Sequence, residues 1–257
     1  METVQSLTEP YGAFLIHPLP VGPGVCATCR AATVDRHIHM QCRACRQPAE
    51  SAPALIADAV VPVSIAVGHE RFATDLWRYK EPLDGEEKLV AQLRLAAVLW
   101  RFLTAHEHCV AIAAGAEAFG LVTTVPSTGG RRRHPFARIV SDLVGVTRER
   151  YAELLIADPA VPADRNMHAD RYLALDGRHA AEVAGADVLL LDDTWTRGGR
   201  AQSAAVTLKK AGAAHVAIVV LGRHFDPRYP ANARYLEQAR KRPFTWEECC
   251  AHPAGLW

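Results

Sequence analysis

The stretch Asp187-Val-Leu-Leu-Leu-Asp-Asp-Thr-Trp-Thr-Arg-Gly-Gly-Arg-Ala-Gln-Ser203 decides the fold of this chain. Its apolar residues 188–191 predict a short buried strand, because continuous Val and Leu runs are typical of parallel strands that are covered on both faces. The run ends in two carboxylates, Asp192 and Asp193, and a loop with the paired glycines Gly198 and Gly199 follows. We therefore expect a strand that delivers two acids and a loop to one edge of a sheet.

The chain then continues into a helix and a second strand. Residues 201–210 predict a helix, since Lys209 and Lys210 lie in its last turn and Gly212 follows its end. Residues 215–221 form another apolar run and predict the next strand. A strand, loop, helix and strand in this order indicate an α/β fold with a mostly parallel sheet, which binds ligands at its carboxyl edge.

The loop between the first strand and the helix has the composition of a phosphate site. Backbone N–H groups of residues 196–200 would gather at the helix N-terminus, which favours a phosphate monoester, and Thr196 adds a hydroxyl group. Asp192 and Asp193 can accept hydrogen bonds from a vicinal diol or hold the waters of a magnesium ion. A ligand with both groups is a ribose 5-phosphate; the alternative is an idle turn with an acidic edge. No GxGxxG motif follows a strand, and a Walker loop is absent.

The length and the charge of the chain limit the classes of protein to which it can belong. A chain of 257 residues with 49% hydrophobic residues can bury a full core, so we expect one main domain and a small accessory piece. The formal net charge of +1 argues against a globally basic nucleic-acid-binding protein. No uncharged apolar run approaches the roughly eighteen residues of a membrane span. Residues 1–20 lack the pattern of a secretory signal, so we expect a cytoplasmic protein.

Four of the seven cysteines form two pairs, Cys26-x-x-Cys29 and Cys42-x-x-Cys45, with twelve residues between the pairs. Each pair can turn two sulfurs toward one ion, and two pairs complete a tetrahedral four-thiolate site. The spacing predicts a structural zinc ribbon; the alternative is two unrelated pairs of buried thiols. His37 and His39, between the pairs, are expected in the hairpin of the ribbon.

A second loop follows another predicted strand, residues 121–126, and reads Ser127-Thr-Gly-Gly-Arg-Arg-Arg133. Small residues at a strand end leave N–H groups free, and the arginines add positive charge, which together suit a diphosphate. A solvated basic turn is the plain alternative. A nucleic-acid contact has little support, because no aromatic residues are interleaved with the arginines.

The other segments are predicted in outline. Residues 60–67 are expected to form a strand, and Pro62 is expected to lie in an edge strand or at a strand start. Asp84 is expected to cap a helix whose apolar stripe runs from Leu89 to Leu103. The remaining expectations are loops at 1–25 and 46–54, a buried strand at 109–113, helices at 135–143 and 147–156, a short apolar piece at 172–175, and an irregular chain after 221.

Two further groups of metal-ligand residues stand outside these motifs. Cys249-Cys250-x-His252 has the residue types of a second metal site or a redox pair, although adjacent cysteines rarely share one ion well. His106-x-His108-Cys109 lies between a predicted helix and a predicted strand, and surface polarity is its plainer interpretation.

Residues 188–200 resemble the phosphoribosyl-diphosphate (PRPP) motif of type I phosphoribosyltransferases, in which four apolar residues and two acids precede a threonine- and glycine-containing loop. The cysteine pairs, Tyr79-Lys80, Val125-Pro126-Ser127 and Arg165-Asn166 resemble the ComF/GntX-like branch, which joins a zinc ribbon to that domain. The resemblance covers roughly residues 25–225 and is specific at the ribbon and the central loop.

The resemblance implies a type I phosphoribosyltransferase fold: a central parallel sheet flanked by helices, a small hood, and an N-terminal zinc ribbon. The implied segments are a loop at 1–24, the ribbon at 25–50, the phosphoribosyltransferase-like domain at 55–225 and an extension at 226–257. The hood is expected within residues 55–80 and 160–175. A homodimer is common in the family.

The resemblance also implies roles for single residues. Asp192 and Asp193 would contact the ribose hydroxyls as the catalytic pair. The reaction would move the phosphoribosyl group of PRPP, with magnesium, onto a small nitrogenous acceptor and release diphosphate. The residues implied for PRPP and its phosphate are Thr194, Thr196, Arg197, Gly198, Gly199 and Arg200. The implied diphosphate loop comprises Ser127, Thr128, Gly129, Gly130 and Arg131.

Arg197 and Arg200 depart from the family motif, which has threonine or serine at these two positions. Backbone amides can still hold a phosphate, but two hydroxyl donors are replaced by guanidinium groups. Two hypotheses therefore stay open: a transferase that turns PRPP over, and a non-catalytic module that binds PRPP or a nucleotide in a regulatory or DNA-uptake complex.

Overall fold

Runs of Val, Ile and Leu form the centre of the structure, a four-stranded parallel sheet with the order β1-β6-β5-β2. The computed structural model describes residues 3–33, 40–81, 85–128, 134–174 and 178–251. The strands of this sheet are β1 (Ala59–Val67), β2 (Leu121–Thr124), β5 (Asp187–Trp195) and β6 (His215–Phe225). A smaller antiparallel pair comprises β3 (Leu155–Ala157) and β4 (Tyr172–Ala174).

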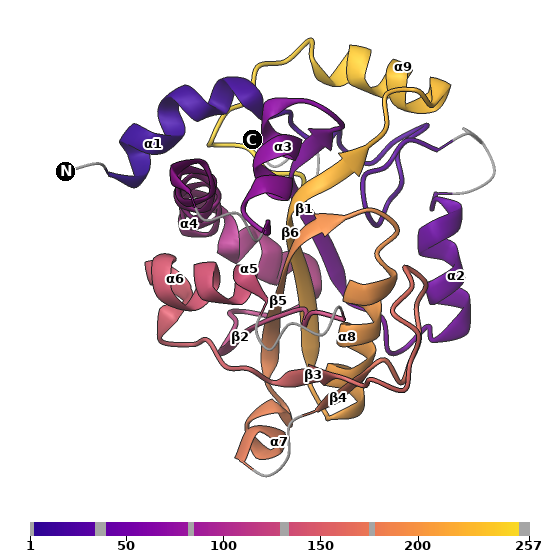
Figure 1. The fold of residues 1–257 in the computed structure, drawn as a ribbon. Helices are drawn as coiled ribbons and strands as arrows, with labels where there is room; N and C mark the ends of the chain where they lie inside the picture. Colours follow the sequence, from indigo (N-terminus) through magenta and orange to yellow (C-terminus); the bar gives the residue numbers. More distant parts are fainter. Residues whose placement is uncertain (1–2, 34–39, 82–84, 129–133, 175–177, 252–257) are drawn as a thin grey trace.

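Helices surround the sheet in the described part of the chain (Figure 1). Short 3₁₀ and π segments cover Gly12–Phe14 and Ile139–Leu143. The α-helices are α1 (Val4–Tyr11), α2 (Arg43–Ser51), α3 (Arg71–Arg78), α4 (Glu86–Ala114), α5 (Pro135–Arg138), α6 (Gly145–Arg148), α7 (Arg178–Val183), α8 (Gly199–Lys210) and α9 (Pro230–Ala239).

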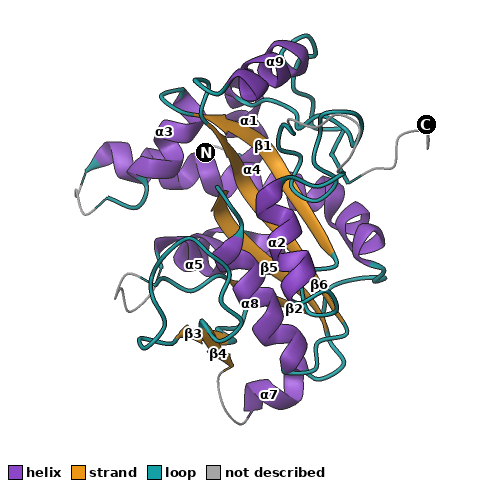
Figure 2. Ribbon diagram, turned by 90° about the vertical axis from the view of Figure 1, so that its right-hand side faces the viewer, coloured by secondary structure: helices purple, strands orange, loops and turns teal. Residues whose placement is uncertain are grey.

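Both faces of the sheet are covered, which explains why its strands are apolar throughout rather than alternating. Leu189 and Leu191 of β5 pack in one cluster with residues of α4, whereas Leu190 packs with Leu208 of α8 on the opposite face. All three leucines of β5 are fully buried, and each such burial stabilises the fold by about 2 kcal/mol. Figure 2 shows α8 and α2 together on one face of the sheet. The expected α/β fold with a central parallel sheet is confirmed.

Parallel pairing brings the carboxyl ends of all four strands to one edge of the sheet, where β5 and β2 meet side by side. The edge position of β1, expected from Pro62, is confirmed by the strand order. The N-terminal helix α1 packs on α4, where Arg101 Nη1 donates a 2.8 Å hydrogen bond to Thr8 Oγ1.

β5 is longer than its apolar run. The strand was expected to end at Leu191, but its pairing with β6 continues through Asp192 and Thr194 to Trp195. Successive residues of a strand point to opposite faces, so the two neighbouring carboxylates are directed to different sides of the sheet. This separation decides which residues each acid meets.

Several outline predictions are wrong. Residues 109–113 lie in the last part of α4, which is capped by Gly115 with a left-handed φ of 79°. Val110 and Ala111 are buried whereas Ile112 is exposed, as expected of one face of a helix rather than of a buried strand. Residues 147–156 split between α6 and β3, α2 occupies most of the expected linker at 46–54, and α1 lies within the expected N-terminal loop. The chain after 221 continues β6 to Phe225 and then forms α9.

The α4 stripe is confirmed in part. Ala96, Ala97 and Leu103 are buried, but Leu89 is 54% exposed. α4 begins at Glu86, and the expected cap Asp84 lies outside the described residues.

Candidate functional site

The carboxyl edge of the parallel sheet carries a cleft of about 740 Å³. β5, the loop after it, the start of α8 and the end of β2 line it, as expected for an open α/β sheet. The sequence-predicted site residues in its lining are Asp192, Asp193, Thr194, Thr196, Arg197, Gly198, Gly199, Arg200 and Ser127.

A basic set of lining residues comes from elsewhere in the chain. Lys80, His134, Arg165 and His224 line the cleft together with the two acids. Lys80 and Arg165 carry fixed positive charges, whereas burial lowers the pKa of His224. Cationic groups near a pair of carboxylates suit a ligand that is itself polyanionic and also carries hydroxyl groups.

Asp193 lies at the centre of a polar cluster on the α3 side of the sheet. Its Oδ2 accepts a hydrogen bond from the buried Tyr79 hydroxyl and lies 2.8 Å from Lys80 Nζ. His134 Nε2 is 4.0 Å from the same oxygen. His134 Nδ1 accepts from the N–H of Phe136, so the neutral ring carries its proton on Nε2, toward Asp193. Burial opposes ionisation of Asp193, but the charge of Lys80 and the hydrogen bonds from Lys80 and Tyr79 outweigh it and hold the pKa of this carboxyl below its ordinary value.

Asp192 has the opposite electrostatic environment. Burial, and then the negative charge of Asp193, raise the pKa of the Asp192 carboxyl above its ordinary value. Its Oδ1 accepts a 2.9 Å hydrogen bond from the backbone N–H of Asp193. The two acids thus differ in role: Asp193 is held by side chains of the protein, whereas Asp192 is the acid that a cation or a hydroxyl donor in the cleft would stabilise.

The helix α3 explains why Tyr79 and Lys80 reach Asp193. Its buried Asp75 accepts a 2.7 Å hydrogen bond from the Tyr11 hydroxyl and lies 3.3 Å from Arg71 and 3.7 Å from Arg94. This network fixes α3 between α1 and α4, and the helix ends directly beside the cleft.

Gly198 and Gly199 are required by the protein itself. Gly198 has a left-handed φ of 77°, and a Cβ there would overlap the buried ring of Trp195. A Cβ on Gly199 would lie 2.5 Å from the carbonyl oxygen of Arg165 and would overlap the backbone of Asn166. These glycines thus let Trp195 and residues 165–166 approach the backbone of the loop.

The two arginines of the loop differ. Arg200 donates from Nη2 to the carbonyl of Ala163 (2.9 Å) and from Nε to that of Asp164 (3.2 Å), so its guanidinium group holds a neighbouring loop. Arg197 is exposed on the rim of the cleft. Because α8 begins at Gly199, the N–H groups of its first turn have no acceptor within the helix. They lie at the end of α8 that adjoins the loop with Arg197.

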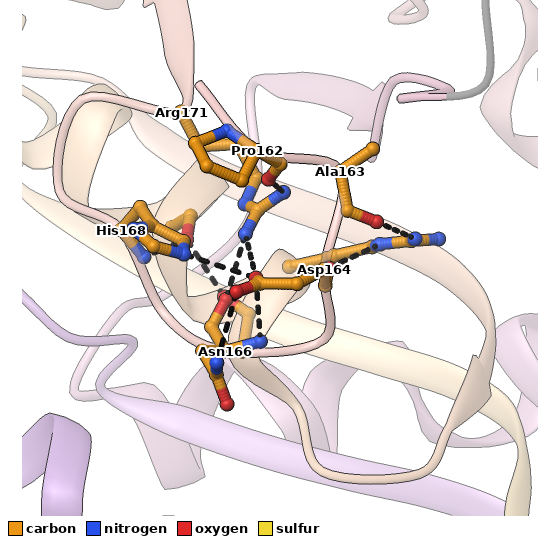
Figure 3. Close-up of polar contacts among 9 residues, drawn as sticks. Pro162, Ala163, Asp164, Asn166, His168 and Arg171 are labelled. Atoms are coloured by element: carbon orange, nitrogen blue, oxygen red, sulfur yellow. Dashed lines mark hydrogen bonds and ion pairs between the residues drawn. The ribbon is translucent and has the colours of Figure 1, made fainter.

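The neighbouring loop, residues 158–171, is built around one buried arginine (Figure 3). Arg171 is 1% exposed and donates to the carbonyls of Pro162 (2.8 Å) and Asn166 (2.9 Å) and to Asp164 Oδ1 (2.7 Å). Desolvation raises the pKa of Asp164. Hydrogen bonds from the backbone N–H of Asn166 and from the side chains of Arg171 and His168 outweigh it and hold this pKa well below its ordinary value. The loop therefore presents Arg165 to the cleft from a fixed frame.

The predicted diphosphate loop is only partly described. Ser127 lines the cleft and also an adjoining cavity of about 530 Å³, and Thr128 lines that second cavity alone. Gly129, Gly130 and Arg131 lie outside the described residues.

The four paired cysteines come together. Their sulfurs lie within 4.8 Å of one another, and Cys29 Sγ is 3.8 Å from Cys42 Sγ, close to the separation of about 3.8 Å between thiolates on a tetrahedral zinc ion. Cys26 and Cys29 flank a tight turn closed by the left-handed residue Arg30 (φ 57°), and Cys42 precedes α2. His37 and His39 lie outside the described residues.

Two buried arginines accompany this cluster. Arg30 and Arg223 are 9% and 8% exposed, and within the described residues their Nε atoms have no hydrogen-bond partner. A zinc ion with four thiolates carries a net charge of −2, so buried guanidinium groups beside it fit a loaded site. The cluster can hold zinc and packs on the sheet through Trp195.

Sequence reasoning missed His134, His69 and His224 as lining residues of the cleft. His69 is an exposed non-glycine residue with a left-handed φ of 71°, a conformation that marks sites for attention. No sequence pattern singles out these histidines, because the sheet topology alone brings them to this edge.

No protein-family model matches the chain, and no curated protein matches it either. Among solved structures, the chain is similar to one described as the structure of the allosteric regulatory enzyme of purine biosynthesis, with 20% identity and a TM-score of 0.28. The similarity covers 48% of this chain and 26% of that one. A TM-score this low does not establish a common fold, so the cleft residues carry the functional inference.

None of the helices in the described ranges has the length and apolar character needed to cross a lipid bilayer.

Proposed function

We propose that this protein is a phosphoribosyltransferase that binds PRPP with magnesium and transfers the phosphoribosyl group to a nitrogenous acceptor, with release of diphosphate. One observation carries the proposal: a single cleft at the carboxyl edge of a parallel sheet combines Asp192, Asp193, the N-terminus of α8 and the basic residues Lys80 and Arg165. Residues 192–200 of this cleft belong to the stretch that resembles the motif of type I phosphoribosyltransferases, from which Arg197 and Arg200 depart.

The 5-phosphate is assigned to the N-terminus of α8. The first-turn N–H groups lack acceptors within the helix, and the helix dipole favours an anion at this end. Thr196 adds a hydroxyl donor and Arg197 a positive charge on the rim. Arg200 is assigned a supporting role, because its guanidinium group holds the carbonyls of residues 163–164.

The ribose hydroxyls are assigned to Asp192. Asp193 is already bound by Tyr79 and Lys80, whereas the pKa of Asp192 is raised by burial and by its neighbour. Two hydroxyl donors or a cation beside Asp192 would supply the partners that its ionised form needs.

The diphosphate is assigned to the basic residues of the cleft. Lys80 and Arg165 lie in the cleft lining together with Ser127, which follows the end of β2. Positive groups at this position would stabilise charge that develops on the leaving diphosphate as the bond to C1 breaks. No covalent intermediate with the protein is needed, so positioning and electrostatics would supply the rate enhancement.

The proposed magnesium ion fits the site through Asp192. The 2.8 Å contact of Lys80 Nζ with Asp193 already places a cation at that carboxylate, which leaves Asp192 and the ligand's own oxygens for the metal. When bound, magnesium would neutralise diphosphate charge. Zinc in the four-cysteine cluster is assigned a structural role, since that cluster packs behind Trp195 rather than in the cleft lining.

Calorimetric titration with PRPP and magnesium tests the proposal. Asp192→Asn should weaken binding at least tenfold, because a hydrogen bond to a charged group contributes about 1.5–3 kcal/mol. Asp187→Asn is the matched control: it lies at the other end of the same strand, where its carboxylate contacts His215 at 2.7 Å, and it should leave the affinity within about twofold. Diphosphate release is then measured across bases, amines and ammonia.

One observation favours a second function, that of a non-catalytic PRPP or nucleotide sensor. The Lys80–Asp193 ion pair satisfies one acid internally, and arginines replace the hydroxyl residues of the motif. Tight PRPP binding without diphosphate release from any acceptor would select this function. Absence of both PRPP binding and nucleotide binding in the wild type would exclude both functions.

A further inference from the structure

A second cluster of metal-ligand residues lies where the helix α4 meets the C-terminal segment of the chain. His106 and Cys109 on α4 meet Cys249 of the C-terminal segment, with their ligand atoms within 4.8 Å of one another. None of the three belongs to the cleft lining or to the four-cysteine cluster. The site therefore has no role in the proposed function.

The geometry of α4 presents two of the ligands together. Residues three apart on a helix share a face, and His106 Nδ1 lies 3.9 Å from Cys109 Sγ. A nitrogen and a sulfur bound to one tetrahedral zinc ion are about 3.5 Å apart, so a small side-chain adjustment brings the pair to ligand distance. Cys249 reaches the same point from 140 residues further along the chain.

The hydrogen bond on the other ring nitrogen of His106 selects the tautomer that a metal requires. His106 Nε2 lies 2.9 Å from the carbonyl oxygen of Trp246, which can only accept, so Nε2 carries the proton. Nδ1 then has a lone pair directed at the two sulfurs. A histidine ligand that donates its second N–H to a backbone carbonyl is the usual arrangement at protein metal sites.

Burial and access also fit a bound ion. His106 is 3% exposed, which fixes the imidazole, whereas Cys109 and Cys249 are half-buried and leave a path from solvent. Two thiolates and one imidazole make a neutral site with a divalent ion, so it needs no buried countercharge. This contrasts with the four-cysteine cluster and its two arginines.

We propose that His106, Cys109 and Cys249 bind a soft divalent metal ion, zinc in particular, which clips the C-terminal segment to α4. Thiolate and imidazole ligands select zinc over magnesium or calcium. Three protein ligands leave one position of a tetrahedral ion for water or a further ligand. The clip would also brace the four-cysteine cluster, because Arg30 Nη2 donates a 2.9 Å hydrogen bond to the carbonyl of Cys250.

Zinc content of the full-length protein, measured by elemental mass spectrometry, tests this site. Cys109→Ser and Cys249→Ser should each bind one zinc equivalent fewer than the wild type. Cys250→Ser is the matched control, since its sulfur contacts the carbonyl of Pro62 instead of the cluster, and it should keep the wild-type content. Equal zinc content in the wild type and in both cluster variants would overturn the proposal.

A second measurement uses the natural sequence and does not depend on how the variants fold. Cys109 and Cys249 should resist alkylation until a strong chelator is added, and peptide mapping reads out both thiols separately from the four paired cysteines. Immediate alkylation in the zinc-loaded protein, or a Cys109–Cys249 disulfide in freshly isolated protein, would contradict a metal site. Loss of PRPP binding bears only on the cleft and leaves this result unaffected.

Discussion

Residues 192–200 enter the cleft as one continuous stretch of β5 and α8, whereas Lys80, His134 and Arg165 enter it from three elements far apart in the sequence. We call the first set the β5–α8 wall and the second the assembled wall. The β5–α8 wall owes its shape to local backbone geometry, with the left-handed Gly198 at the start of α8. The assembled wall owes its shape to tertiary contacts such as Lys80 with Asp193. Substitution of a single glycine can therefore disrupt the β5–α8 wall. The assembled wall is disrupted only when a tertiary contact is removed.

The largest effect is expected from Gly198→Ala, which attacks the β5–α8 wall. A left-handed φ and overlap with the buried Trp195 ring should together lower the free energy of unfolding by about 3 kcal/mol. Urea denaturation measures this. Gly120→Ala is the control, since nothing lies within 4 Å of its added methyl group, and it should be neutral or slightly stabilising. Equal stability of the two variants would show that the loop has another accessible conformation.

The next effect is expected from Arg171→Met, which attacks the frame of the assembled wall. Loss of the hydrogen bonds to the carbonyls of Pro162 and Asn166 should lower the free energy of unfolding by about 2 kcal/mol. The matched control is Arg148→Met, an exposed arginine with one bond to the carbonyl of Asp142, whose effect should stay within about 0.5 kcal/mol.

Residues 165–166 give this variant a second readout. They pack against Gly199, so loosening of the loop in Arg171→Met should also expose that loop to limited proteolysis. Unchanged cleavage in the arginine variant would mean that α8, rather than Arg171, fixes the assembled wall.

The difference between the walls also explains what sequence reasoning could predict. The β5–α8 wall was predictable because apolar strand, acids, glycines and helix follow one another in the chain. The four-cysteine cluster was predictable because its spacing alone brings two sulfurs together. Even there, the strand end was misplaced, since hydrogen bonding to β6 carries β5 past its apolar run to Trp195.

The assembled wall could not be predicted residue by residue. Tyr79 and Lys80 reach Asp193 only because Asp75 fixes α3 between α1 and α4, and α1 lies in a segment expected to be a loop. Likewise, His106 and Cys109 share a helix face only because α4 continues through the segment expected to be a strand. One wrong secondary-structure assignment there hid the cluster with Cys249, since its members are distant in sequence.

A smaller effect is expected where the two walls meet, from Asp192→Asn. The pKa of Asp192 is raised in the folded state, so this acid favours folding when protonated, below about pH 4, and costs stability as pH rises toward its folded pKa. Asp192→Asn should therefore raise the free energy of unfolding by about 1 kcal/mol at pH 8, an advantage that vanishes near pH 4.

Asp193→Asn should show the reverse behaviour. The pKa of Asp193 is lowered in the folded state, so its contribution is present above about pH 4 and is lost as pH falls through the folded value. Urea denaturation across this range compares the two variants. Parallel pH curves would mean that both acids share one environment, contrary to their placement on opposite faces of β5.

The smallest effects are expected from the two arginines of the loop, which lie three residues apart on the β5–α8 wall. Arg200→Ala should lower the free energy of unfolding by about 1 kcal/mol, because its guanidinium group joins this wall to the carbonyls of Ala163 and Asp164. Arg197→Thr should change it by less than about 0.5 kcal/mol, since that side chain is exposed on the rim.

The two arginine variants should rank in the reverse order when the affinity for the ligand is measured instead of the free energy of unfolding. Arg197 faces the proposed phosphate site, so Arg197→Thr should weaken PRPP binding and reduce its dependence on salt, as expected when one cation near a phosphate is lost. Arg200→Ala should alter affinity less than stability, because its hydrogen bonds are made within the protein. Calorimetry at two salt concentrations decides between these roles. If Arg200→Ala loses more affinity than Arg197→Thr, the phosphate site depends on the junction between the walls rather than on the rim.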